Sequence, residues 1–240
     1  MRRIWRSCCR WGYCYIYPRA ERAGRDLGRK RMQLVRCQTM QILAIENILA
    51  RQTGGRISSE RVKRLTAEQI EELGLAPDVA LALEANRAVS ETLQQQIEVL
   101  EKRLKERVKL RPEYRLLKTV PGIGETLATT IMLETGTITR FASVGNFSSY
   151  CRCVDSRRES NGKKKGEGNA KNGNKYLAWA FVEAANFALR YCPEAKRFYE
   201  RKKRKTNGIV AIKATAHKLA RACYHMLREQ KPFNVQRCFV

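Results

Sequence analysis

The chain has 240 residues and carries 48 Lys plus Arg against 23 Asp plus Glu, a formal net charge of +25. A charge this large repels itself in a compact protein and is neutralised by a polyanion, so we expect nucleic acid as the partner. The longest apolar stretch, 176–182, is far too short to span a bilayer, and no secretion or lipidation signal occurs, so we expect no membrane partner.

The nine cysteines are expected to be reduced thiols. Their number is odd, their positions are scattered, and Cys151-Arg-Cys153 lacks the second ligand pair that a zinc site needs. We therefore assign no metal and no disulfide.

The N-terminal part of the chain contains one long helical pattern. Residues 1–14 are rich in Arg, Trp and Cys without periodicity, so we expect no defined element there. Apolar residues at helical spacing then predict a helix over 30–52, which ends at Thr53-Gly54-Gly55.

Two further helices are predicted before residue 112. Thr66 begins a capping signal and Gly74 supplies an end, so a short helix is placed at 66–73. A long helix runs from Pro77 to about Leu110. Its apolar residues follow the four-three-four spacing of a coiled-coil seam, at Leu93, Ile97, Leu100 and Leu104.

Two arrangements bury this seam. The helix over 30–52 can fold back on it as an antiparallel hairpin, or a second protomer can fill it. The sequence leaves both open, and we expect 15–111 to be a helical hairpin or coiled-coil region that favours a homo-oligomer.

A turn rich in glycine opens the second region, 112–235. Val120-Pro-Gly-Ile-Gly124 has helical sequence on both sides, which is typical of a helix-hairpin-helix. In such a motif Gly122 and Gly124 form a tight turn, and the following helix directs its free N–H groups at a phosphate. The alternative is a plain helical corner that packs on the rest of the domain.

One hydroxyl stands among glycines and cations in the segment 156–173. With a single small apolar residue the segment cannot bury itself, and we expect a solvated loop. Ser160 is the candidate nucleophile, because attack on phosphorus needs flexible backbone and positive charge; the alternative is a basic loop that only touches phosphate. The residues expected to contact nucleic acid here are Arg157, Arg158, Gly162, Lys163, Lys164, Lys165 and Lys171.

The C-terminal part reads as helices with basic surfaces. Asn174 is placed as the cap of a core helix over 175–191. Glu183 in this helix is either an odd buried charge or a residue at the helix rim or in a structural pair. The run 201–205 is interpreted as a phosphate-facing turn, with Lys202 and Lys203 as contacts. The last helix is expected to pack through Ile209, Ile212, Ala216, Leu219, Cys223 and Met226, and 236–240 form a tail.

Several segments occur here in a specific order: Tyr15–Arg22, Val120–Gly124, Phe147–Cys153, Ser160–Gly166 and Asn172–Ala185. In this order they resemble insertion-sequence transposases of the 110/1111 group. The resemblance implies DNA transposition through a composite active site. One half is a ribonuclease-H-like, RuvC-like domain with four acidic residues that bind Mg²⁺, and the other is a C-terminal domain whose serine attacks DNA.

The resemblance also assigns residues and partners. The serine of the family's Ser-x-Gly loop matches Ser160, with Gly162 as its glycine. DNA, a structured guide RNA and a bacterial, cytoplasmic location on nucleoid DNA are implied. No cofactor is expected in this chain, because the family's Mg²⁺ belongs to the acidic domain, for which we find no counterpart.

These observations lead to one fold expectation and two functions. We expect an all-α protein, with a long helical hairpin or coiled coil followed by a compact helical domain that contains the helix-hairpin-helix. The first function is a truncated transposase or recombinase with a serine nucleophile, inactive on its own. The alternative is a non-catalytic nucleic-acid-binding protein that inhibits full-length transposase by joining its oligomers.

Overall fold

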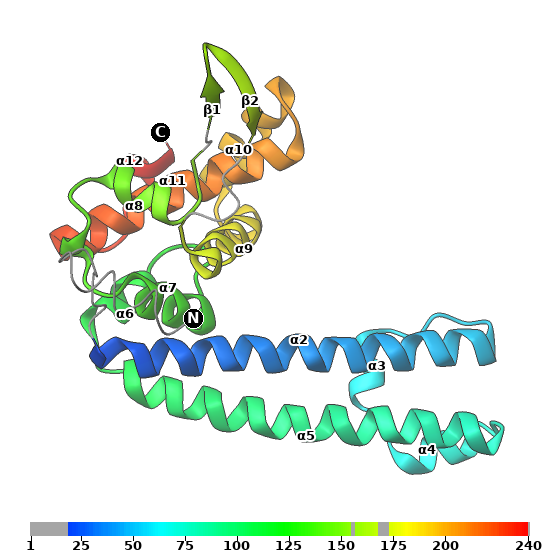
Figure 1. The fold of residues 1–240 in the computed structure, drawn as a ribbon. Coiled ribbons are helices and arrows are strands. Elements are labelled where there is room, and N and C mark those ends of the chain that lie inside the picture. The colour runs from blue at the N-terminus through cyan, green and yellow to red at the C-terminus, as the bar shows by residue number, and fades with distance from the viewer. Residues whose placement is uncertain (1–18, 155–156, 168–172, 240) are drawn as a thin grey trace. The chain divides into compact units, whose positions relative to one another are not determined.

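The computed structural model describes residues 19–154, 157–167 and 173–239 (Figure 1). The side chains of 19–21, 157–160 and 164–167 are outside this description, as are residues 1–14 and Lys171. The chain divides into two compact units, which we call the hairpin unit, Asp26–Glu106, and the C-terminal unit, Met1–Arg25 with Arg107–Val240.

The described residues are almost wholly helical, which confirms the all-α prediction. The exception is one two-stranded hairpin in the C-terminal unit. No helix in the described ranges is long and apolar enough to cross a membrane.

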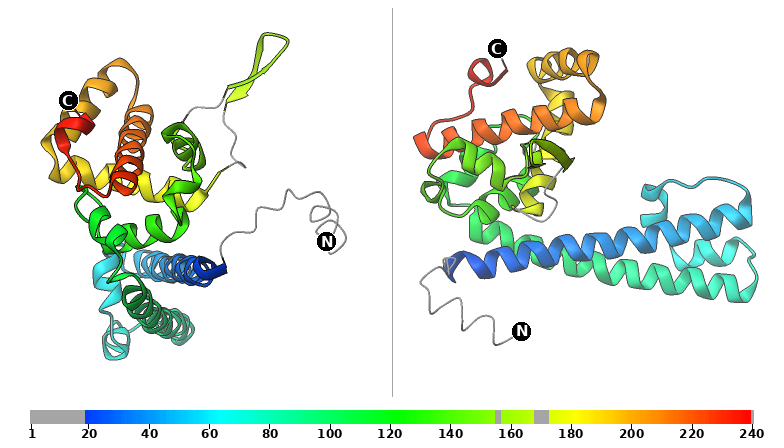
Figure 2. Two further views of the ribbon diagram at one scale, coloured as in Figure 1. Left: turned by 90° about the vertical axis from the view of Figure 1, so that its left-hand side faces the viewer. Right: turned by 45° about the horizontal axis from the view of Figure 1, so that its top comes forward.

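The hairpin unit is built on two long antiparallel helices, as predicted (Figures 1 and 2). Arg31 Nε donates to Glu101 Oε1 at 2.8 Å, and Gln38 Nε2 donates to Gln94 Oε1 at 2.9 Å. From the first bond to the second, the residue number rises by seven in one helix and falls by seven in the other, as expected for an antiparallel pair. The helices of this part of the chain are α2 (Arg19–Thr53), α3 (Ser59–Lys63), α4 (Ala67–Glu72) and α5 (Pro77–Val108).

The end of the hairpin unit at which α2 ends and α5 begins holds a small apolar core. Leu49 of α2 and Leu83 of α5 are fully buried in it, and the short helices contribute Val62 and Ile70. The predicted cap at α4 is present as a reciprocal capping box between Thr66 and Gln69. Along the expected seam Ile97 and Leu104 are buried, whereas Leu93 and Leu100 are half-buried.

The C-terminal unit is centred on two helices, α9 and α11. The α9 helix has the predicted bounds, and Leu177, Phe181 and Ala184 within it are fully buried. The Phe147 ring of α8 lies 6.2 Å from that of Phe181 and 5.9 Å from that of Tyr224 in α11. The helices of this unit are α6 (Pro112–Leu117), α7 (Glu125–Thr135), η1 (Ile138–Arg140, a 3₁₀ turn), α8 (Val144–Tyr150), α9 (Lys175–Tyr191), α10 (Pro193–Lys205), α11 (Gly208–Glu229) and α12 (Val235–Phe239).

Three local expectations differ from the structure. The run 201–205 is not a turn but the end of α10, because Phe198 anchors that helix and cations are favourable at a helix C-terminus. Glu183, by contrast, is half-buried, which agrees with the helix-rim alternative. Ile209, expected in the packed face of α11, lies in the first turn of that helix and is 71% exposed. Residues 236–239, expected as a tail, lie in α12.

Candidate nucleic-acid interface

The segment with the candidate serine is a β-hairpin, not the expected loop. Strands β1 (Arg157–Ser160) and β2 (Lys163–Glu167) are antiparallel, and Ser160 lies opposite Lys163. Asn161 and Gly162 between them have φ angles of 54° and 69°. Two positive φ values define the turn that matches strand twist, and Asn-Gly is its preferred sequence, which explains why this polar segment pairs with itself.

The hairpin contains most of the residues that were predicted to contact nucleic acid. Its register shifts after Arg158, so that Lys165 is the extra residue of a β-bulge in β2. Asn161, Gly162 and Lys163 at its tip are exposed, as expected of a solvated segment. Figures 1 and 2 show the hairpin extending away from the helices of its unit.

The base of this serine hairpin is fixed to the helical core. Asn174 N donates to Tyr150 O at 2.7 Å, and Arg152 Nη2 donates to Gly173 O at 3.1 Å, so the two ends of the segment are joined. Gly173 has a φ of 81°, and a Cβ there would approach Tyr150 O to 2.6 Å. Only glycine therefore permits this closure.

One side chain connects the base to two helices. Asn174 Oδ1 caps α9 by accepting from Tyr176 N at 2.8 Å and Leu177 N at 3.2 Å. Its Nδ2 donates to Glu134 Oε2 of α7 at 2.6 Å and to the Tyr150 hydroxyl at 3.3 Å. The side chain of Asn174 thus uses both its donor and its acceptor groups in a buried position.

The two glycines of the predicted helix-hairpin-helix have different surroundings. Gly122 has a φ of 87°, and a Cβ there would collide with the backbone of Ala184 and Ala188 in α9. Gly124, the N-cap of α7, has open space where its Cβ would be. Gly122 therefore packs as the corner alternative describes, whereas Gly124 leaves the start of α7 open to approach. Phosphate binding by either remains a prediction.

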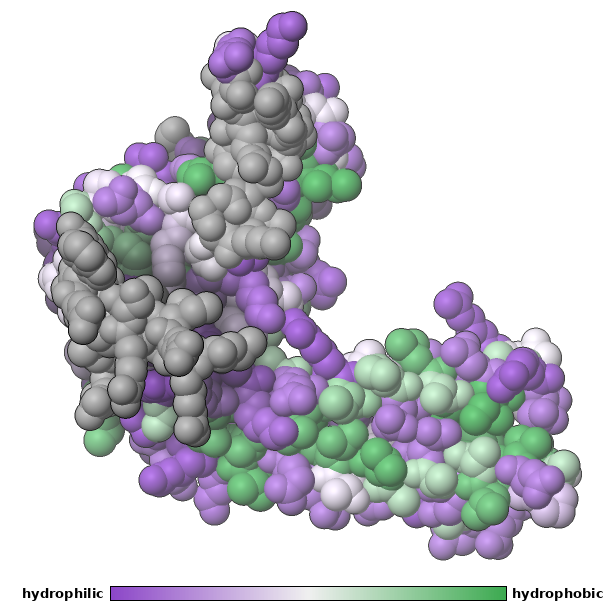
Figure 3. Space-filling view, in the orientation of Figure 1, coloured by the Kyte–Doolittle hydropathy of each residue, from purple (hydrophilic) through white to green (hydrophobic). Residues whose placement is uncertain are grey.

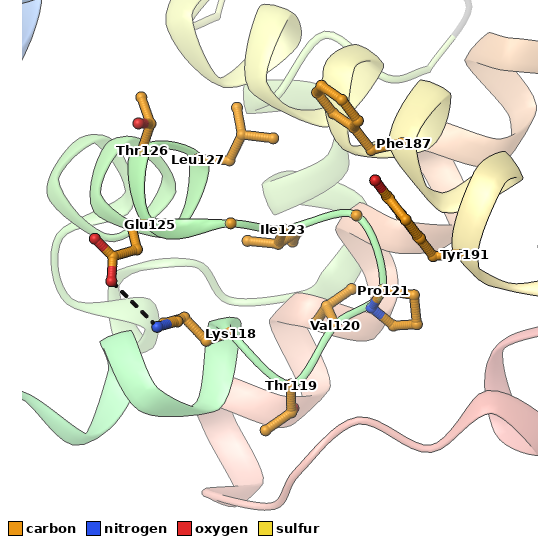
Figure 4. Close-up of a pocket in the computed structure, with 12 residues that line it drawn as sticks. Lys118, Thr119, Val120, Pro121, Ile123, Glu125, Thr126, Leu127, Phe187 and Tyr191 are labelled. Carbon is orange, nitrogen blue, oxygen red and sulfur yellow. Dashed lines mark hydrogen bonds and ion pairs between the residues drawn. The ribbon is translucent and has the colours of Figure 1, made fainter.

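A groove of about 520 Å³ runs along this corner. On one side it contains Leu127 and an ion pair of 3.5 Å between Lys118 Nζ and Glu125 Oε1. Opposite lie Phe187 and Tyr191 of α9, with exposed fractions of 38% and 71%, as Figure 4 shows. Exposed rings beside a helix N-terminus suit the bases and phosphates of nucleic acid. Neither ring was predicted as a contact, because Phe187 was expected in the core and Tyr191 only as the last residue of the helix.

The last predicted contacts lie at the end of α10. Lys202 and Lys203 are exposed, within a fully exposed stretch that continues to Asn207. Asn207 Oδ1 accepts from Val210 N at 2.9 Å and so starts α11. The cationic end of α10 is therefore followed directly by a capped helix of the core.

The described cysteines are buried or half-buried free thiols. Burial raises the pKa of Cys153 to about 12 and that of Cys238 to about 12, and the pKa of Cys151 lies well above its usual range for the same reason. These thiols are neutral near pH 7, whereas metal ligation requires thiolate. Within the described ranges, no three His, Cys, Asp or Glu side chains are grouped to hold a metal ion.

Comparison with known proteins identifies one domain. Residues 114–200 match the family model described as Transposase IS116/IS110/IS902 family. The match extends from α6 into α10 and includes the glycine corner, the serine hairpin and Asn174. No curated protein matches the chain.

Proposed function

Since residues 114–200 form a transposase domain of the IS116/IS110/IS902 family, which implies DNA binding, we propose that this domain presents Ser160 to a DNA phosphate as a nucleophile. The observation that carries the proposal is the hairpin geometry. The backbone of Ser160 ends β1 at an exposed two-residue turn, opposite Lys163, on a hairpin with a clamped base. A nucleophile on such a support can reach a backbone phosphate without burial of the duplex.

The chemistry is a transesterification. The Ser160 oxygen forms a bond to phosphorus, one bond from phosphorus to a deoxyribose oxygen breaks, and that oxygen leaves as a hydroxyl group. The serine proton passes to a general base. Cations on the hairpin, such as Lys163, stabilise the negative charge that develops on the phosphate oxygens.

The resembled family holds Mg²⁺ on acidic residues of its ribonuclease-H-like domain, so the reaction is tested with a full-length relative present. Sequencing the DNA upstream of this reading frame tests the expected truncation, because a frame for the acidic domain should be found there. A structured guide RNA remains part of the prediction.

A non-catalytic role is the second candidate, and one observation favours it. The hairpin unit exposes large apolar side chains, with Met40 at 66%, Leu81 at 71% and Val99 at 60%. Figure 3 shows such hydrophobic surface, in green, interspersed along this unit. Isolated apolar residues are ordinary, but several along one helical pair suit a second chain. The chain would then join full-length oligomers and inhibit them.

A covalent-adduct assay separates the two functions. Wild-type protein, Ser160→Ala and the control Ser149→Ala, an exposed serine of α8, are each mixed with labelled insertion-sequence ends and a full-length relative. Only the label that migrates with the shorter chain is scored, because the relative forms its own adduct. The first function predicts a label that survives denaturing electrophoresis with wild-type and Ser149→Ala protein and disappears with Ser160→Ala. The same absence of label with all three proteins, together with inhibition of the relative, would favour the second function.

A further inference from the structure

A second groove lies in the C-terminal unit, on the exposed side of α11. It has a volume of about 570 Å³ and is bounded by α11 and by the segment 231–238, which we call the α11 groove. The backbone N–H of Phe233 donates to Thr119 Oγ1, just after α6, at 3.0 Å. Lys218 Nζ of α11 donates to Cys238 O at 2.7 Å and holds the segment beside the helix.

The charge of the α11 groove is strongly positive. Four Lys or Arg side chains and two histidines line it, against the single acid Glu229. Glu229 is shared, because Arg237 Nη1 lies 3.4 Å from one of its oxygens and His225 Nδ1 lies 3.6 Å from the other. Arg221 and Lys231 have no acidic partner among the residues that the structure describes. Two uncompensated cations at a groove are complementary to phosphate.

The groove is also partly apolar. Met226, Pro232 and Phe233 line it together with the cations. A duplex backbone is bound by cations alone, whereas an unpaired base gains from stacking on an aromatic ring. The combination therefore fits a nucleotide that has left the base-paired stack.

The α11 groove adjoins the base of the serine hairpin. His217, which lines the groove, shares a hydrogen bond of 3.0 Å between its Nδ1 and Cys153 O. Cys153 lies four residues before Arg157, the first residue of β1, and its N–H donates to Ser148 O at 3.0 Å. A strand held in the groove would thus lie at the root of the element that carries Ser160.

We propose that the α11 groove binds an unpaired nucleotide of the DNA strand, with its phosphates on Arg221 and Lys231 and its base against Phe233. This inference rests on the DNA binding in the proposed function. It adds a strand-separating contact that the serine chemistry does not require. DNA is the nucleic acid that the matched transposase family implies.

Fluorescence anisotropy with a short single-stranded DNA, the same sequence as a duplex, and the same sequence as RNA tests the proposal. The variants are Arg221→Ala with Lys231→Ala, Phe233→Ala and Phe233→Leu. The matched control is Arg61→Ala with Lys63→Ala, which removes two exposed cations from α3.

The double cation variant should bind single-stranded DNA about tenfold or more weakly. The slope of the logarithm of the binding constant against the logarithm of the salt concentration should be shallower by about 1.4, because two phosphate contacts on a single strand are lost. The α3 control should change affinity less than about twofold. Both Phe233 variants should weaken single-stranded binding about fivefold to 100-fold and leave duplex binding unchanged within about twofold. Phe233→Leu keeps an apolar side chain but has no ring, so a loss of affinity in this variant reports lost stacking rather than a folding defect.

Three outcomes would overturn the proposal: groove variants that behave like the α3 control, equal losses for single strand and duplex in Phe233→Leu, or tighter binding of the RNA than of the DNA strand. Each can occur while the Ser160 adduct still forms. If wild-type protein forms no covalent adduct but still binds single-stranded DNA through the groove, the result would instead count against the serine function.

Discussion

The side-chain amide of Asn174 donates a 2.6 Å hydrogen bond to the carboxylate of Glu134, and both residues are buried. The same asparagine caps α9, and its backbone N–H binds Tyr150 O. This pair therefore joins α7 and α9 at the point where the serine hairpin leaves the core. We infer that it sets the direction of the hairpin.

Replacement of Asn174 by Ala should destabilise the protein by about 2–4 kcal/mol, because it removes a helix cap and a hydrogen bond to a charged group. The midpoint of urea unfolding measures this change. Asn207→Ala is the matched control, since Asn207 caps α11 from an exposed position, and it should cost only about 1 kcal/mol. Equal losses in the two variants would show that the bond to Glu134 contributes nothing.

The two glycines of the corner should respond differently to alanine. Gly122→Ala places a Cβ against the α9 backbone at a positive φ, so it should cost about 2–5 kcal/mol. Gly124→Ala meets open space at a φ of −83° and should cost no more than about 1 kcal/mol. Thermal unfolding followed by circular dichroism gives both values. Similar midpoints for the two variants would contradict the packing role of Gly122.

The core of the hairpin unit should depend on Leu49. Leu49→Ala removes a fully buried side chain between α2 and its neighbours and should cost about 2–5 kcal/mol. Leu43→Ala, at a 48% exposed position of the same helix, should change stability by less than about 0.5 kcal/mol. The protection of α5 backbone amides from hydrogen exchange measures this local loss of stability. Unchanged protection in Leu49→Ala would mean that α5 is not held by this core.

Alkaline pH should weaken the C-terminal unit through its buried thiols. The pKa of Cys153 is raised by burial from 9.0 to about 12 in the folded protein. The unfolded chain therefore loses this proton first, and stability present below pH 9 falls as the pH rises toward 12. Cys153→Ala should lose less free energy of unfolding between pH 8.5 and about 10.5 than wild-type protein, measured in reducing buffer. Cys37→Ala is the control, and the same slope in both variants would refute the assignment.

Helix bounds were predictable wherever a local signal matched the tertiary packing. Asn174 and Pro193 enclose α9, and the capping box at Thr66 starts α4. The β-hairpin was not foreseen, although Asn161-Gly162 is a turn signal. Its strands lack alternating apolar residues, so periodicity gave no indication of them.

Much of the site could not be predicted because it depends on contacts between distant segments. Glu134 lies 40 residues before Asn174, and nothing near it in sequence indicates the bond. Phe187 was assigned to the core from the apolar composition of α9, but composition does not show which face another helix covers, and Phe187 is 38% exposed. The α11 groove combines one face of a helix with a short returning segment, and only folding brings the two together.

The identity of the residue that bonds to DNA tests the central claim most directly. Wild-type protein is incubated with insertion-sequence ends and a full-length relative, the DNA is digested to a nucleotide, and the modified peptide is sequenced by tandem mass spectrometry. The account predicts a nucleotide phosphate on Ser160 and no modification in Ser160→Ala. A nucleotide on any other residue, or one that persists in Ser160→Ala, would contradict it.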